Sequence, residues 1–144
     1  MLTLVVLLTA GACAASTATP APSGEPASSP GGGSIVFGMA ISADSHQITA
    51  PSETFPRAYA GIVWFIASFR EAPDPTALTV TLARQSGDAE VRVWSHPAPI
   101  PDPPGPKLAD GRSLAELGAL QPGTYVMRVM QATTSLAEGR FEVR

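Results

Sequence analysis

The side chains most able to do chemistry in this chain are few and scattered. His46 lies in a polar stretch with Asp44 and Ser45, and Glu53 follows a few residues later. Hydrolysis needs a nucleophile, a base and an orienting group that converge on one pocket, and neighbours on a single loop cannot face one another. His96 precedes a proline-rich stretch and is interpreted as the end of a strand. We therefore expect a protein that is not an enzyme.

Metal and cofactor chemistry has equally little support. The two histidines stand fifty residues apart, and no carboxylate pair or second cysteine lies at a zinc-ligand spacing. Met39, Met127 and Met130 suggest soft copper ligation, but Met127 and Met130 have opposite parity on one expected strand and so point to opposite faces. Core packing is the favoured interpretation of these methionines. No phosphate loop, dinucleotide fingerprint or serine elbow is present, so we expect no metal and no cofactor.

Cys13, the only cysteine, ends an apolar run of residues 2–10 and a small-residue stretch of residues 9–12. The run is too short for a membrane span, which needs roughly 20 residues, and has the length of a secretory signal core. The order of apolar run, small residues and cysteine resembles a bacterial lipoprotein signal. The resemblance implies that Cys13 is acylated, becomes the first residue and anchors the protein to a membrane on its outer side, in the bacterial cell envelope.

The signal departs from the usual pattern because the first basic residue of the chain is Arg57. We expect an in-frame upstream start that adds a short basic head. Two alternatives stay open: a buried N-terminal element with an incidental thiol, and an ordinary secretory signal cleaved near Ala12 or Ala15. Ala10 also stands where lipoproteins more often carry leucine.

Residues 14–34 have the composition of a tether. They contain one charged residue, no aromatic and no large aliphatic side chain, so they cannot bury enough surface to fold. Four prolines stiffen the stretch, which reaches on the order of 60 Å when extended. The expected organisation is a signal peptide over residues 1–12, a lipidated tether over 13–34 and one domain over 35–144.

Charge excludes one class of partner. The net charge is -3, and eight of the nine basic residues are arginines interspersed with acids, all after position 56. There is no basic stripe for nucleic acid or anionic lipid. With one cysteine, no disulfide forms within the chain, so the core alone must hold the domain.

The domain is predicted to contain seven short strands, at residues 35–41, 54–57, 59–69, 77–85, 90–95, 123–131 and 136–144. Residues 59–69 are apolar on both parities, as in a strand covered on both faces. The pattern predicts that Val91 and Val93 point inward. In the last two strands the inward set is Tyr125, Met127, Val129, Phe141 and Val143. Seven strands in about 110 residues favour an all-β, immunoglobulin-like sandwich, with an open barrel as the alternative.

A tyrosine corner supports this fold. Ser113 and Glu116 form a capping box that predicts a short helical turn, and Leu120, a Pro-Gly pair and Tyr125 follow. This order resembles the tyrosine corner of fibronectin type III and related sandwiches, in which the hydroxyl bonds a backbone group upstream. Trp64 fits the immunoglobulin arrangement better than the fibronectin one, so the resemblance is to a generic immunoglobulin-like domain.

One stretch of the domain is unusual. Six prolines between positions 97 and 106 enforce an extended segment that a partner could bind, although a rigid crossover between sheets explains it as well. By parity Trp94 lies on the polar face beside this loop, where it is either an exposed anchor or covered by the prolines. We take Trp94 with Pro99, Ile100 and Pro101 as the candidate binding site.

These observations predict a membrane-anchored extracytoplasmic lipoprotein whose β-sandwich binds or spaces. The membrane, through the lipid on Cys13, is one partner; an envelope protein or polysaccharide is the other, and no nucleic acid is expected. The alternative function is an inhibitor or accessory module for an exported hydrolase, acting through a loop.

Overall fold

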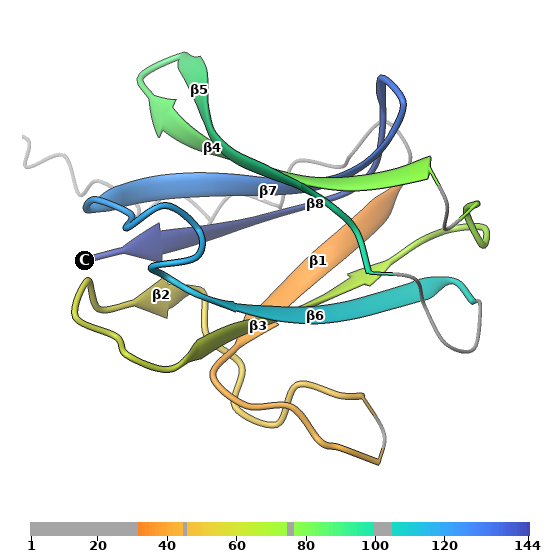
Figure 1. Ribbon diagram of the computed structural model, residues 1–144, viewed down its shortest axis with the longest axis horizontal. Helices are drawn as coiled ribbons and strands as arrows, with labels where there is room; N and C mark the ends of the chain where they lie inside the picture. The colour runs from red at the N-terminus through yellow and green to blue at the C-terminus, as the bar shows by residue number, and fades with distance from the viewer. Residues whose placement is uncertain (1–31, 45, 75–76, 100–104) are drawn as a thin grey trace, which may run out of the picture.

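The computed structural model describes residues 32–44, 46–74, 77–99 and 105–144 (Figure 1). Cys13 and the part of the predicted tether before Gly32 lie outside the described residues. Eight strands follow in chain order: β1 (Gly33–Gly38), β2 (Thr54–Phe55), β3 (Ile62–Ser68), β4 (Leu78–Ser86), β5 (Ala89–Pro97), β6 (Lys107–Ser113), β7 (Gly123–Gln131) and β8 (Thr134–Val143).

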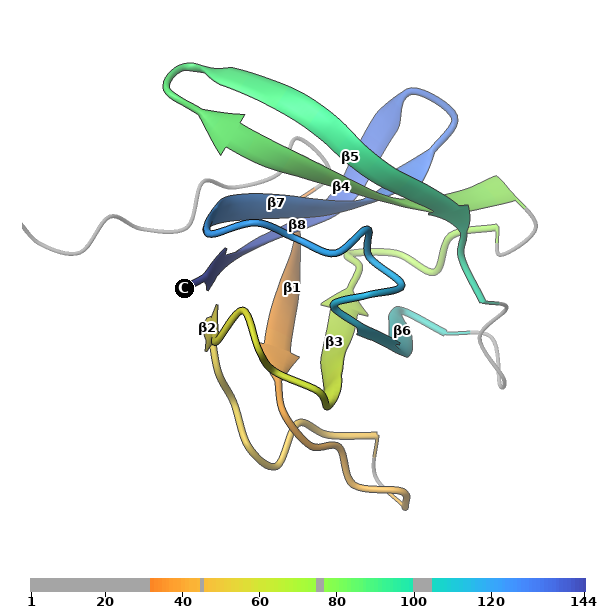
Figure 2. The same cartoon turned by 60° about the vertical axis from the view of Figure 1, so that its left-hand side comes forward.

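The strands form one curled sheet in the order β5-β4-β7-β8-β1-β3-β6, and β2 pairs with β8. Pairing is antiparallel except where β8 meets β1 and β2. The curl lets β1, β3 and β6 face the four-stranded arm of β5, β4, β7 and β8 (Figure 2). The expected all-β, immunoglobulin-like sandwich is confirmed.

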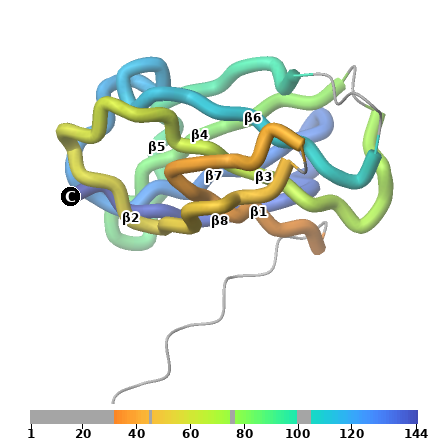
Figure 3. Tube along the Cα trace, turned by 90° about the horizontal axis from the view of Figure 1, so that it is seen from below, coloured from red at the N-terminus to blue at the C-terminus, as the bar shows by residue number. Residues whose placement is uncertain are grey.

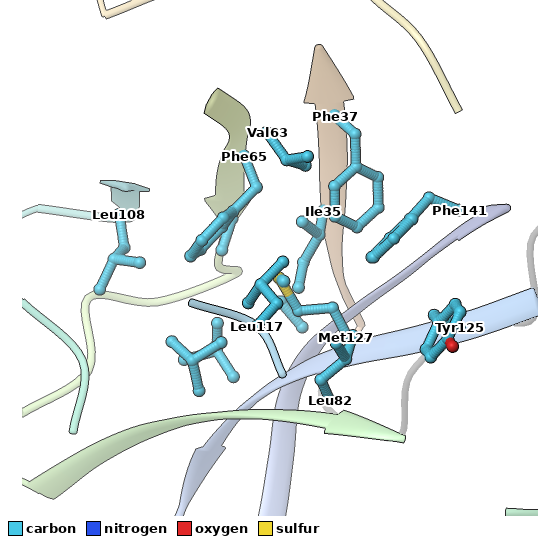
Figure 4. Packing of buried hydrophobic residues seen from close by; sticks show 14 of the residues in the cluster. Ile35, Phe37, Val63, Phe65, Leu82, Leu108, Leu117, Tyr125, Met127 and Phe141 are labelled. Atoms are coloured by element: carbon cyan, nitrogen blue, oxygen red, sulfur yellow. The ribbon is translucent and has the colours of Figure 1, made fainter. Parts of the chain in front are cut away.

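The core lies between the two arms because alternate residues of each strand point inward (Figure 4). Phe37 of β1 packs on Phe141 of β8, with ring centroids 5.1 Å apart. The inward set predicted for the terminal hairpin is fully buried, as are Leu82 and Phe65 from the facing arms. Met127 is completely buried and belongs to the core, as predicted.

The tyrosine corner is confirmed in its geometry. The Tyr125 hydroxyl donates a hydrogen bond to the Gln121 carbonyl oxygen at 2.7 Å. The buried Tyr125 ring stacks on Phe141 at 5.7 Å, and Leu120 is buried in the same core. The segment of Leu120 and Gln121 is thereby held against the start of β7.

The segment between β6 and β7 forms one hydrogen-bonded turn and no helix. Ser113 and Glu116 make the predicted capping box: the Ser113 amide donates to the Glu116 carboxylate, and the Glu116 amide donates to the Ser113 hydroxyl. The turn ends at Gly118, whose φ is +102°, with the Ala119 amide bonded to the Leu114 carbonyl in a Schellman arrangement.

The sequence analysis missed β6, which it included in a loop. This strand pairs with β3 from Lys107 to Ser113 along its whole length. Apart from the buried Leu108, its residues, KLADGRS, are polar or small and have low strand propensity, so it is formed by pairing with β3 rather than by its own pattern.

One expectation about the first strand is wrong, namely that Met39 packs in the core. β1 ends at Gly38, so Met39 is exposed and does not continue the inward set. Trp64 lies on β3 but outside the core, on the outer face, where its ring packs over Gly111 of β6. The inner face of β3 is buried, while its outer face is only partly covered.

Candidate functional site

Trp94 does not lie where alternation places it. A β-bulge shifts the β4–β5 register: Leu82 pairs with Trp94, but Ala83 pairs with Arg92, so that Val93 is the extra residue. One inserted residue moves Trp94 to the face opposite Glu90 and Arg92. The prediction of a tryptophan on the polar face is therefore wrong.

Trp94 instead packs against the core as a half-buried side chain. Its ring stacks on the exposed His96 with centroids 5.8 Å apart and an interplanar angle of 24°. The inward placement predicted for Val91 and Val93 fails as well, since these side chains are 58% and 40% exposed. The hairpin tip around them extends beyond the core.

The proline-rich loop connects the two arms of the sheet. Its first residues are held by a hydrogen bond from the Ala98 amide to the Leu78 carbonyl, and its last by one from the Phe69 amide to the Pro106 carbonyl. Pro99 is half-buried, whereas Ile100 and Pro101 lie outside the described residues. The ends of the loop thus fit the interpretation as a crossover between arms, and the structure does not bring a complete binding site together around Trp94.

His46 lies in a hairpin, here called the finger, that is described at residues 39–44 and 46–52 and projects from the end of β1 (Figure 2); Figure 3 shows the molecule from the side of the finger. Backbone bonds hold it, from the Met39 amide to the Ala50 carbonyl and from the Thr49 amide to the Ala40 carbonyl. His46 has a φ of +46° and is exposed. Among the described residues, no identified hydrogen bond or ion pair joins the His46 side chain to another side chain.

The outer side of β1, β3 and β6 is apolar. Register places Val36 beside Ile66 and Ala109, and Gly38 beside Trp64 and Gly111, with Ile62 in the next row of β3. We call this set the outer three-strand face. Val36 is 52% and Ile62 37% exposed, and Trp64 is half-buried. Sequence reasoning missed this face, although the two-sided apolar pattern of residues 59–69 signals it.

The outer side of the other arm carries a charge network instead. Arg128 of β7 donates to Glu90 of β5 through two nitrogens and to Glu138 of β8 through Nε, and Glu138 also pairs with Arg140. The hydrogen bond from Arg128 holds the pKa of Glu90 below its ordinary value, and the same bond raises the pKa of Arg128. The network joins β5, β7 and β8. Because two acids balance two bases, it has no net charge that would attract a charged ligand.

Beside this network lies a cleft of about 180 Å³, lined in part by Thr81, Arg92 and Met130. Met130 lies on the face opposite Met127, as predicted, and lines this surface cleft, so the prediction that it packs in the core is wrong. In the part of the chain that the structure describes, no three His, Cys, Asp or Glu side chains could hold a metal ion, and no buried side-chain nitrogen or oxygen lacks a hydrogen-bond partner. The described residues contain no helix that is long and apolar enough to cross a membrane.

Comparison with known proteins returns little. No family model matches the chain, and no curated protein does. Among solved structures, an immunoglobulin-like protein from Pseudomonas aeruginosa is similar at 18% sequence identity and a TM-score of 0.45, over 76% of this chain and 91% of that one.

Proposed function

We propose that the chain is a lipid-anchored lipoprotein of the bacterial cell envelope whose β-sandwich is a non-catalytic binding module. The order of apolar run, Cys13 and tether supports the anchor. The partner is an envelope protein, and the outer three-strand face is the surface that contacts it.

The exposure of this face carries the proposal. Its two central rows, Val36–Ile66–Ala109 and Gly38–Trp64–Gly111, contain no charged or hydroxyl side chain. Ile66 is buried and Ile48 of the finger packs on Gly38, so the exposed apolar surface is that of Val36, Trp64 and the neighbouring Ile62. Serines, including Ser113 beside Ile62, and Lys107 stand at the margins. A contiguous apolar surface fits the apolar centre of a protein interface. Its centre offers few hydrogen-bonding groups for a polysaccharide, and its only cation is Lys107 at the margin, which is too little for an acidic polymer.

The position of the tether agrees with this assignment. β1 starts at Gly33, so the last two residues of the predicted tether lie in the first strand, and Ser34 aligns with Ser68 and then with Lys107, where the proline-rich loop ends. The end of the loop at Pro106 therefore lies at the end of the sandwich that would face the membrane. Ile62 and Trp64 lie toward the other end, which a tethered domain presents outward.

Site-specific photo-crosslinking tests the face in cells that display the full chain. A crosslinker at Val36 should give a protein adduct, and Ile62→Glu should remove it. A crosslinker at Val91, which is 58% exposed on β5, is the matched control and should give none. A carbohydrate adduct at Val36, equal adducts at both positions, or no adduct would each overturn the protein-partner proposal.

The finger favours a second candidate function, an inhibitor or accessory module for an exported hydrolase. Its own backbone bonds, including the Ser42 amide to the Gln47 carbonyl at 2.8 Å, preorder an exposed loop that could enter a concave active site. The full chain should then inhibit or activate an envelope hydrolase, and His46→Ala combined with Gln47→Ala should abolish the effect. Unchanged hydrolase rates with the unaltered chain would reject this candidate.

A further inference from the structure

A second surface, independent of the outer three-strand face, lies at the end of the sandwich that holds the tyrosine corner. It is a cleft of about 280 Å³ between residues 57–59 and the turn that precedes β7. Leu114, Leu120, Ala119 and Tyr59 supply apolar lining, and Arg57 supplies the one charged side chain among the lining residues. Apolar walls with a single polar anchor are typical of small-ligand sites.

Both walls of the cleft are fixed by hydrogen bonds. On one side the Arg57 amide donates to the main-chain oxygen of Arg144 and the Tyr59 amide to the Pro56 carbonyl. The Tyr59 ring packs on the buried Phe55 with centroids 5.7 Å apart. This wall is thereby attached to the core and to the end of β8.

On the other side, the Schellman turn places Ala119 at a φ of +48°, and the hydrogen bond from Tyr125 holds the carbonyl of Gln121. Leu114 and Leu120 are nearly fully buried and form the floor. A ligand that enters the cleft therefore orders little of the protein, which lowers the entropic cost of binding.

The charges around the cleft leave Arg57 available. The neighbouring Glu116 carboxylate is bound by Ser113, and Glu142 is paired with Arg144 at 2.9 Å. Arg57 has no carboxylate within ion-pair distance among the residues that the structure describes. A guanidinium beside an apolar cleft matches a carboxylate that carries an aliphatic group.

We propose that this cleft binds an aliphatic carboxylate, with the alkyl group over Leu114 and Leu120 and the carboxylate on Arg57. The volume of about 280 Å³ accommodates about nine groups of the size of a water molecule, which take about 30 Å³ each. That is the size of a short fatty acid, or of the last residue of a peptide with an aliphatic side chain. The fatty acid and the peptide C-terminus share an aliphatic group and a carboxylate, and the test below distinguishes between them.

The test is calorimetric titration of the full-length chain, purified in a neutral detergent, with N-acetylleucine, with its uncharged amide and with hexanoate. A ligand this small should bind with a dissociation constant of about 0.1–1 mM. The amide should bind at least tenfold more weakly. Binding of N-acetylleucine alone identifies a peptide C-terminus, binding of hexanoate alone identifies a fatty acid, and binding of both shows that the alkyl carboxylate suffices.

Variants separate the cleft from detergent partitioning and from misfolding. Arg57→Gln should weaken acid binding at least tenfold, and Ala115→Leu should fill the cleft and abolish binding with an unchanged thermal midpoint, since Ala115 lines the cleft and is exposed. Arg92→Gln, which removes another exposed arginine, should leave binding unchanged. The proposal is overturned if neither acid binds at about 10 mM, if the amide binds as well as the acid, or if Arg57→Gln binds like the unaltered chain.

Discussion

Removal of one hydroxyl at the tyrosine corner tests the register of the sandwich. In Tyr125→Phe the ring keeps its stack on Phe141, but the Gln121 carbonyl loses the donor that lies 2.7 Å away. A buried acceptor left unpaired costs about 1–3 kcal/mol. Because Gln121 is exposed and water can reach its carbonyl, we expect the lower end, about 1 kcal/mol.

Urea and thermal denaturation measure this loss. A change of about 1 kcal/mol lowers the midpoint of a domain of this size by about 4 °C, with an unchanged urea slope. Tyr59→Phe is the matched control: the only other tyrosine donates at 3.3 Å to the Ile62 carbonyl in an exposed position. Its loss should cost below about 0.5 kcal/mol. Equal midpoints for wild type and both variants would refute the argument that the corner bond stabilises the fold.

Three further changes follow from the same contacts. Ser113→Ala should lower the unfolding free energy in urea by about 0.5–2 kcal/mol, because it removes the capping-box bonds to Glu116; no loss would exclude a stabilising cap. The pKa of Glu90 lies below its ordinary value of 4.5, first because of the hydrogen bond from Arg128, so its contribution is complete above that pH and is lost on acidification. The stability difference between wild type and Glu90→Gln should therefore shrink from about pH 6 to about pH 3, and a difference independent of pH would contradict this. Trp94→Ala should cost about 1–3 kcal/mol, less than a fully buried tryptophan, and an unchanged thermal midpoint would show that the ring is not packed on the core.

The parts of the fold that the sequence predicts are those encoded by local patterns. Alternation in residues 123–131 and 136–144 identifies both the strands and their inward faces, since each face is either buried or polar. The corner is likewise predictable, because a capping box, a leucine and a Pro-Gly pair before Tyr125 occur within fourteen residues. The turn between β4 and β5 is predictable from Gly87, because glycine freely adopts the φ of +60° that this turn requires.

The parts that the sequence does not predict depend on partners distant in the chain. The bulge at Val93 is a property of the β4–β5 pairing, and one extra residue reverses the face of every side chain after it, Trp94 included. β6 has no strand pattern and exists through its pairing with β3. Both effects explain why the candidate site was predicted incorrectly. The bulge reverses the face of Trp94, and the β3–β6 pairing creates the outer three-strand face by bringing Gly111 beside Trp64.

The proposed anchor and the proposed binding surface, the outer three-strand face, depend on each other energetically. Burial of a whole valine or isoleucine contributes about 1.5–3 kcal/mol. Because Val36 is 52% and Ile62 37% exposed, their remaining surface contributes about 1 kcal/mol each, and Trp64 adds a similar amount. The sum falls short of the roughly 4 kcal/mol that corresponds to a millimolar dissociation constant.

Such a face captures a partner only when both are confined together. A tether on the same membrane supplies an effective concentration in the millimolar range without any new contact. We therefore expect Cys13→Ala to abolish the adduct at Val36 even though the domain stays folded, as judged by an unchanged thermal midpoint. Fusion of the Cys13→Ala chain to an unrelated membrane anchor should restore the adduct. Full crosslinking by the unanchored chain would show that the face binds strongly by itself, and that the tether serves only to hold the protein at the membrane.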